Sequence, residues 1–369
     1  MAKGSESGSG KKLRSGFTTG TAATAAVKAA LIHLFTGKIP ESVAVQLLID
    51  KQLHIDIRDG RGIDADTTRC TVVKDGGDDP DITHKAVIGA EVHINRNAQT
   101  DAIRIRGGKG VGTVTKKGLE TPPGEPAITS GPLEMMRMAD LEIRKLYGTK
   151  AAVDIEVFVP LGEILTRKTL NGRLGILGGI SILGTTGVVK PLSHASYIAT
   201  IDASLSVARA AGLRHVVFTT GRRSERFAQD LWPDIVSEGF FQMGDFFEKT
   251  MTSAAGHGFR QVTIAVFFGK AVKMAQGIGH THARSARLTL DKLAGWALEV
   301  TGSSSLVKQI RKANTARHVF DFIKDDYPAL ISRVGREIVG VAYGFSKKQV
   351  AVRVVIFDFD GSLCFDSSV

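Results

Sequence analysis

The rhythm of hydrophobic and polar positions along the chain changes near residue 195. Before that point, the first clear element is an alanine-rich stretch at 21–35, which predicts a helix. The pair Thr18-Thr19 suits the N-cap of this helix, and Gly37 suits its end. A second helix is expected at 132–147.

Short apolar segments around these helices predict strands. The runs at 42–49 and 52–57 flank a polar pair, which is the pattern of a hairpin. The other strands are expected at 69–73, 90–94, 102–105 and 153–159. Because these strands come early and the helices are interspersed irregularly, residues 13–194 are expected to form an α+β domain. The polar, Gly/Ser-rich residues 1–12 are interpreted as a disordered lead.

Beyond residue 195, helices and strands alternate regularly. Helices are predicted at 197–211, 224–231 and 246–255, strands at 215–220, 239–243 and 261–268, further helices within 283–343, and a last strand at 350–357. This alternation is typical of a parallel sheet covered by helices. Residues 195–369 are therefore expected to form a smaller α/β, Rossmann-like domain.

Ligands of such domains bind outside the carboxyl ends of the strands. Three predicted strands end in a glycine with polar or charged neighbours: Thr219-Thr220-Gly221-Arg222, Met243-Gly244-Asp245 and Phe268-Gly269-Lys270. Since these ends meet at one edge of a parallel sheet, we expect the three loops to line one site.

Composition narrows the class of ligand. A formal net charge of +11 suits nucleic acid, an anionic membrane surface or a polyanionic small molecule. Nucleic acid is the weaker choice, because only four Tyr and two Trp are present for stacking and no helix carries a dense basic face. The apolar runs are far shorter than the roughly 18 residues of a membrane span. With two distant cysteines, these features predict a soluble, cytoplasmic protein without disulfides.

The glycine-rich loop, residues 177–189 (LGGISILGTTGVV), carries the hydroxyls of Ser181, Thr185 and Thr186. Glycines let backbone N–H groups approach an anionic or polar ligand, and hydroxyls add hydrogen bonds. The loop has neither the Lys-Ser/Thr ending of a P-loop nor the G-x-G-x-x-G spacing. We interpret it as ligand-binding; the alternative is a tight crossover packed on small residues.

The acidic loop, residues 74–84 (KDGGDDPDITH), places four carboxylates beside His84. Clustered oxygens suit Mg²⁺ or Ca²⁺, and histidine suits proton transfer, but a solvated turn capped by aspartates explains the loop as well. The spacing is not that of an EF-hand, so no protein-bound metal is predicted. A polar loop facing a substrate is favoured over both chemical readings.

Two shorter segments add candidates. The GHTH segment, residues 279–282, presents His280 and His282 at a spacing that does not suit a helical zinc site. These imidazoles can bind carboxylates, move protons or simply begin a helix. Near the N-terminus, Thr18-Thr19-Gly20-Thr21 places hydroxyls and N–H groups at a helix start, where anions bind, although plain capping is a strong alternative.

A segment near the C-terminus, 358–363 (DFDGSL), imitates the nucleophile loop of haloacid-dehalogenase phosphatases. In that class the loop begins a domain whose other catalytic groups follow it. Here only residues 364–369 follow, so the segment is interpreted as a terminal strand and turn without a catalytic role.

Taken together, these segments resemble the cobalt-precorrin-5B C1-methyltransferase family, also called the CbiD family. The matching stretches are, in order, GFTTGTAA (16–23), KDGGDDPDITH (74–84), GKGVGTVTKKGL (108–119), GEPAI (124–128), LGGISILGTTGVVKP (177–191), TTGRRSE (219–225), QMGDF (242–246) and GHTHA (279–283). The ordered set is specific where each stretch alone is weak. The chain departs from the usual pattern at Ala22, where cysteine is common, at Lys85, where glycine is usual, and at Gly244-Asp245, which replaces Ser-Asn.

The resemblance implies a ribosomal-protein-S5-like α+β domain followed by the α/β domain. It also implies transfer of a methyl group from S-adenosylmethionine to C1 of a cobalt-bearing, ring-contracted corrin precursor. That macrocycle is rimmed with acetate and propionate carboxylates, which suits a basic protein. The expected partner is this small corrinoid, not nucleic acid or a membrane, and the cobalt arrives with the substrate.

On this interpretation the two ligands divide the candidate residues. The methyl donor is expected at Thr219, Thr220, Gly221, Arg222, Met243, Gly244, Asp245 and Gly269. The corrinoid is expected between the domains, against Thr18, Thr19, Gly20, Thr21, Asp75, Asp78, Asp79, Thr83, Ser181, Thr185, Thr186, Gly187 and His282. His84 and His280 are the candidates for any proton removal.

Two other classes of function stay open. S5-like domains also occur in small-molecule kinases, and nucleotide binding without S-adenosylmethionine binding would favour that class. A non-catalytic corrinoid carrier would bind the macrocycle without producing S-adenosylhomocysteine. A homo-oligomer, or transient contact with other enzymes of the pathway, is compatible with the sequence.

Overall fold

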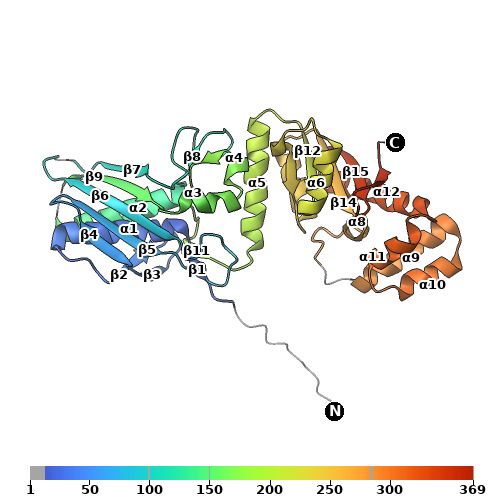
Figure 1. The fold of residues 1–369 in the computed structure, drawn as a ribbon, viewed down its shortest axis with the longest axis horizontal. Coiled ribbons are helices and arrows are strands. Elements are labelled where there is room, and N and C mark those ends of the chain that lie inside the picture. Colours follow the sequence, from blue (N-terminus) through green and yellow to red (C-terminus); the bar gives the residue numbers. More distant parts are fainter. Residues whose placement is uncertain (1–12, 99, 149, 283–285, 369) are drawn as a thin grey trace, which may run out of the picture. The chain divides into compact units, whose positions relative to one another are not determined.

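The computed structural model describes residues 13–98, 100–148, 150–282 and 286–368 (Figure 1). The chain divides into two compact units, unit 1 ending at Ser193 and unit 2 beginning at His194, and each is described by itself. Among the described residues, no helix combines the length and apolar character needed to cross a membrane. The lead predicted at 1–12 lies outside these residues.

Unit 1 is built on a five-stranded sheet of order β4-β5-β6-β9-β7 (Figure 1). The strands are β4 (Asp59–Gly62), β5 (Thr67–Val73), β6 (Val87–Asn95), β9 (Ala152–Phe158) and β7 (Ile103–Gly107). Neighbours are antiparallel except β7 and β9, which are parallel. Helix α1 (Thr19–Thr36) packs on β5 and β6, and helix α2 (Ser130–Tyr147) packs on α1.

Helix α1 is buried over most of its length, which explains its alanine-rich composition. Its small side chains are fully buried and let it lie close to the sheet and to α2. At its start, the side chain of Thr18 accepts a hydrogen bond from the N–H of Thr21. At its end, Gly37 has a left-handed conformation (φ 69°) and donates to the carbonyl of His33. The predicted cap and end of this helix are confirmed.

Shorter elements complete unit 1. The predicted hairpin is confirmed as β2 (Ser42–Gln46) paired with β3 (Gln52–Asp56). Two further pairs join β1 (Gly16–Phe17) with β11 (Val188–Val189) and β8 (Thr113–Val114) with β10 (Ile176–Leu177). The helical turns α3 (Gly162–Leu165), η1 (Thr166–Lys168) and α4 (Asn171–Leu174) follow β9. The β1–β11 pair fixes the N-terminal segment against the end of the glycine-rich loop.

Unit 2 contains a second five-stranded sheet, of order β13-β12-β14-β15-β16. Four strands are parallel: β12 (His215–Thr219), β13 (Phe240–Gln242), β14 (Gln261–Phe267) and β15 (Ala351–Phe357). The edge strand β16 (Leu363–Asp366) is antiparallel to β15. The parallel sheet is thus confirmed, and the segment at 358–363 forms the turn between the last two strands.

Helices connect the strands of unit 2. They are α5 (His194–Ala210), α6 (Arg222–Leu231), the turn η2 (Ser237–Gly239), α7 (Phe247–Gly256), α8 (Phe268–Ala275), α9 (Ala286–Thr301), α10 (Ser304–Lys312), α11 (Ala316–Ile323) and α12 (Pro328–Phe345). The prediction of a loop after β14 is wrong. Helix α8 begins directly after the strand, so Gly269 lies in the first turn of this helix. Phe268 and Val272 of α8 are buried, so the apolar run of the strand continues as the buried face of the helix.

Candidate functional site

The order of the parallel strands in unit 2 marks a ligand-binding edge. The strand that follows β12 in the sequence, β13, lies on one side of it, and β14 lies on the other. This reversal is a topological switch point, and in open parallel sheets ligands bind in the crevice outside the carboxyl ends of the strands there. The residues that end β12, β13 and β14 therefore share the favoured edge.

The segments after β12 and β13 are tied to each other. Thr219 is fully buried at the end of β12; its hydroxyl donates to the carbonyl of Phe241 (3.2 Å), and its carbonyl accepts from the N–H of Met243 (2.8 Å). The N–H of Thr220 donates to the hydroxyl of Ser224 (3.3 Å). A Cβ added to Gly221 would meet no atom within 4 Å, so the backbone is open at this point.

Asp245, after β13, is the centre of a hydrogen-bonded cluster. Its carboxylate accepts from the ammonium of Lys270 and from the hydroxyl of Thr281 (2.9 Å). Its carbonyl accepts from the N–H of Thr281 (2.9 Å), and the carbonyl of Thr281 accepts from Lys273 (3.1 Å). Thr281 is fully buried. The GHTH segment is thereby fastened to the end of β13 and to α8, so three chain segments meet at this edge.

The charge of Lys270 follows from its surroundings. Burial lowers the pKa of Lys270 to about 8, and the nearby ammonium of Lys273 acts in the same direction. The carboxylate of Asp245 favours the charged form, so Lys270 is a cation at neutral pH. The edge therefore presents an Asp–Lys pair that can bond polar and anionic groups of a ligand.

Aromatic rings and imidazoles surround His280. The centroid of the His280 ring lies 4.9 Å from that of His194, 5.1 Å from that of Phe246 and 6.1 Å from that of His282. Desolvation lowers the pKa of His280, and the charges of His194, His282 and Lys270 lower it further. His280 is therefore the neutral imidazole at pH 7, with an unprotonated nitrogen able to accept a proton.

In unit 1 the N-terminal threonines and the glycine-rich loop form one junction. The hydroxyl of Thr19 donates to the carbonyls of Ser181 (3.1 Å) and Leu183 (3.3 Å), and that of Thr21 donates to the carbonyl of Gly187 (2.8 Å). Thr18, Thr19, Thr21 and Ser181 are buried. Gly20 donates to the carbonyl of Leu183 (3.1 Å). These hydroxyls hold the loop in place and do not face solvent.

The exposed part of the glycine-rich loop is its tip. Thr185 and Thr186 are both exposed, and the hydroxyl of Thr186 donates to the carbonyl of Val188 (3.3 Å). Gly187 has a positive φ of 78°, and a Cβ there would lie 2.6 Å from Leu47. Of the hydroxyls predicted in this loop, those of the tip are therefore the ones that can reach a ligand.

The acidic loop uses its carboxylates internally. Asp75 pairs with the guanidinium of Arg14, which lowers the pKa of Asp75 to about 2. Asp78 accepts from the N–H of Arg14 (2.7 Å) and Asp79 from that of Leu192 (2.9 Å). Within the part of the chain that the structure describes, no three His, Cys, Asp or Glu side chains are grouped so that they could hold a metal ion. In the structure, the aspartates of this loop therefore cap backbone groups and pair with Arg14, which is the arrangement of a capped turn.

Lys74 and Asp81 close the same loop from inside. Lys74 is 1% exposed and its ammonium donates to Asp81 at 2.5 Å. Burial opposes ionisation of Asp81, but Lys74 and the hydrogen bonds from the buried Thr83 outweigh it and lower the pKa of Asp81. The Nδ1 atom of His84 accepts from the N–H of Gly76 (3.0 Å), so the proton of the neutral ring is on Nε2. That geometry suits His84 for donating to a carboxylate more than for removing a proton.

The structure therefore gathers the candidates into two sets. The predicted donor residues and both GHTH imidazoles lie in unit 2, and the remaining predicted substrate residues lie in unit 1. Sequence reasoning missed Lys270 and Thr281 as partners of Asp245, and Phe246 as a neighbour of His280. Lys270 directly follows the predicted residue Gly269 and could have been included with it. The pairing with Asp245 could not be predicted, because Lys270 and Thr281 lie 25 and 36 positions away from it in the sequence.

Comparison with known proteins identifies relatives over most of the chain. The CbiD family model matches residues 6–191, and the model of the CbiD C-terminal domain matches residues 280–368. The chain is 44% identical over 315 residues to a protein of Geobacillus kaustophilus named cobalt-precorrin-5B C(1)-methyltransferase, covering 85% of this chain and 84% of the relative. Proteins of the same name from Nitratidesulfovibrio vulgaris and Geobacter sp. are each 41% identical, covering 95% and 97% of this chain and 92% and 99% of theirs.

Among solved structures, the cobalamin biosynthesis protein (cbiD) of Archaeoglobus fulgidus matches with a TM-score of 0.39 and 26% identity, covering 70% of this chain and 78% of that protein. The family models together with the long, well-covered relatives settle the classification. This chain belongs to the CbiD family.

Proposed function

We propose that this chain is an S-adenosylmethionine-dependent methyltransferase that acts at C1 of cobalt-precorrin-5B in cobalamin biosynthesis. The observation that carries the proposal is the identity of 41–44% to proteins of that name over most of the chain. The name of these relatives specifies the reaction, and the methyl donor follows from the class of enzyme.

The carboxyl edge in unit 2 supports the site of the donor. Gly221 leaves its backbone open to a ligand, and Asp245 follows the neighbouring strand β13. Carboxylates at such edges accept hydrogen bonds from the ribose or amino groups of nucleoside ligands. Lys270, a cation paired with Asp245 in this cluster, supplies an ammonium group of the kind that bonds a carboxylate such as that of the donor's amino-acid part.

The chemistry asks little of the protein beyond positioning. The donor is already activated: C1 attacks the methyl carbon while the bond from that carbon to sulfur breaks, and the neutral thioether leaves. Holding the reacting atoms in line supplies roughly 7–11 kcal/mol of the barrier reduction in well-oriented reactions. His280, as the neutral imidazole, is the better of the two histidines for taking a proton, because the Nδ1 of His84 is occupied. The tip of the glycine-rich loop and the acidic loop supply the polar surface for the macrocycle.

The S5-like class of unit 1 and the Rossmann-like class of unit 2 stay predictions. Their support is the packing of α1 on a mainly antiparallel sheet in unit 1, with α2 packed on α1, and the parallel order β13-β12-β14-β15 in unit 2.

Donor binding is the direct test. S-adenosylhomocysteine is expected to bind the wild-type chain in calorimetry, and Asp245→Asn is expected to weaken it by about 10-fold or more, because a hydrogen bond to a charged group is lost. The matched control is Asp202→Asn in the same unit, whose carboxylate bonds Ser253 and His257. Nucleotide binding in place of S-adenosylhomocysteine binding would point to the kinase class instead.

The tip of the glycine-rich loop provides a second prediction. Replacing Thr185 and Thr186 by valine is expected to abolish methylation, a fall of at least about 100-fold in kcat/KM, because two exposed hydroxyls that face the substrate are removed. Thermal melting should stay at the wild-type value, since neither side chain is buried. Thr36→Val, an exposed threonine at the end of α1, is the control. Wild-type turnover by the double variant would contradict this placement.

A further inference from the structure

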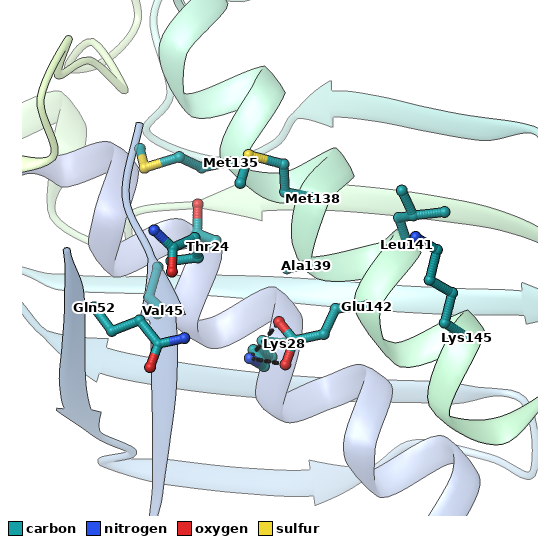
Figure 2. A pocket seen from close by; sticks show the side chains of 11 residues that line it. Thr24, Lys28, Val45, Gln52, Met135, Met138, Ala139, Leu141, Glu142 and Lys145 are labelled. Atoms are coloured by element: carbon teal, nitrogen blue, oxygen red, sulfur yellow. Dashed lines mark hydrogen bonds and ion pairs between the residues drawn. The ribbon is translucent and has the colours of Figure 1, made fainter. Parts of the chain in front are cut away.

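A cavity in unit 1 lies apart from every residue assigned above. It has a volume of about 340 Å³ and lies between α1, α2 and the β2–β3 hairpin (Figure 2). Met135 and Met138 of α2 and Val45 of β2 form its apolar wall. Lys28 of α1 and Glu142 of α2 form its charged wall, and Figure 2 shows their side chains directed toward each other. The cavity therefore combines an apolar surface with an ion pair.

Lys28 is the unusual member of this lining. It is 6% exposed in a helix whose other buried residues are all uncharged, alanine being the commonest. Its ammonium donates to both carboxylate oxygens of Glu142 (2.7 Å each) and to the carbonyl of Ala44 (2.6 Å). Burying a cation is costly even when it is paired, and an apolar residue would serve packing better. A buried cation retained in the wall of a cavity is a group suited to binding an anion.

Glu142 is a partner that can be exchanged. Its side chain is 55% exposed, whereas that of Lys28 is 8% exposed. A carboxylate this exposed loses little by returning to water, but Lys28 cannot follow it and needs another acceptor. With Lys145 also in the lining, the cavity carries two ammonium groups and one carboxylate. An additional carboxylate would neutralise this excess of positive charge.

The glycine-rich loop contacts the starts of α1 and α2, the two helices that line the cavity further along. Gly20 of α1 donates to the carbonyl of Leu183, and a Cβ added to Gly20 would lie 2.4 Å from Pro132 of α2. Thr24 and Lys28 follow Gly20 at one and two turns further along α1. The rise from Gly20 to Lys28 is about 12 Å at 1.5 Å per residue. A ring that contacts the loop must therefore itself lie along the first turns of α1 if one of its arms is to meet Lys28.

We propose that this cavity receives one carboxylate-bearing arm of the polycarboxylated corrinoid, with Lys28 as the cation that binds it. The inference rests on the proposed function and adds a substrate contact to it. The arm replaces Glu142 on Lys28, and Met135 and Met138 contact its methylene carbons. An uncharged arm is rejected, because displacing Glu142 would leave Lys28 buried and unpaired. The cavity thus selects for a free carboxylate at one position of the macrocycle.

The test compares three variants by calorimetry with cobyrinic acid, a corrin whose arms are free carboxylates, and with its methyl ester. Lys28→Met is expected to weaken binding of the acid by about 30-fold or more. Glu142→Gln is expected to tighten it by about 2- to 5-fold, since the competing carboxylate is gone. Glu134→Gln neutralises an exposed charge on the same helix outside the cavity and should leave the affinity unchanged. The methyl ester should bind wild type more weakly than the acid does, and Lys28→Met should not weaken binding of the ester further, because the buried cation that rejects an uncharged arm is gone.

The outcomes separate this inference from the proposed function. If Lys28→Met fails to fold, Glu142→Gln alone decides, because a purely structural ion pair predicts lower stability without tighter binding. Equal affinities for wild type, Glu142→Gln and Glu134→Gln would overturn the inference. If wild type still forms S-adenosylhomocysteine with the corrinoid substrate in that case, the proposed function stands. If wild type neither binds cobyrinic acid nor forms S-adenosylhomocysteine, both fail.

Discussion

Gly184→Ala is expected to destabilise unit 1 by more than about 3 kcal/mol, a large effect for a single methyl group. Gly184 has a positive φ of 141°, and a Cβ there would lie 2.3 Å from the hydroxyl oxygen and 2.5 Å from the Cβ of Thr18. Thr18 is the N-cap of α1, the helix at the centre of the unit 1 core. Displacing Thr18 therefore removes the cap as well as adding strain.

The control for this prediction lies in the same loop. Gly178 also has a positive φ, of 81°, but a Cβ there would meet no atom within 4 Å. Gly178→Ala should cost only about 1–2 kcal/mol, from backbone strain. Denaturant unfolding of the two variants gives the comparison. Equal losses in the free energy of unfolding would show that the close contact between Gly184 and Thr18 does not limit the substitution.

Much of the fold was predictable because it depends on local periodicity. The alanine-rich helix with its cap, the hairpin, and the parallel strands of unit 2 all follow from patterns within about a dozen residues. The β1–β11 pair and α8 were not predicted. Two-residue strands carry no period, and the apolar run through Phe268 reads equally well as the end of a strand or the buried start of a helix.

The candidate site was predictable only in part, for a different reason. Strand-end glycines identify the loops of a parallel sheet, and the segments after β12 and β13 do lie at neighbouring strand ends. The partners of each side chain are set by tertiary packing. Thr19 and Thr21 look like ligand groups in the sequence, yet their hydroxyls bond the glycine-rich loop. Lys28 looks like an interruption of an apolar helix, and only its position against Glu142 shows that it lines a cavity.

His280→Gln is expected to lower kcat by about 100- to 10,000-fold if His280 removes the proton in the proposed reaction. Because the pKa of His280 is lowered, its proton-accepting form persists as the pH falls. Activity of the wild type should therefore be lost on acidification only at a midpoint below the ordinary histidine value of about 6.5. The measurement is the pH profile of kcat, followed through formation of S-adenosylhomocysteine.

Replacing the neighbouring imidazoles provides a control, because a purely structural role of His280 would not change the pH profile of kcat. His194→Gln removes an imidazole that lowers the pKa of His280 and whose ring centroid lies 4.9 Å from that of His280. It should keep most of the maximal rate but move the acid limb of the profile to higher pH, since the pKa of His280 rises toward its ordinary value. His282→Gln should act in the same direction. An unchanged limb in both variants, or wild-type kcat in His280→Gln, would remove His280 from the reaction and leave positioning as the whole contribution of unit 2.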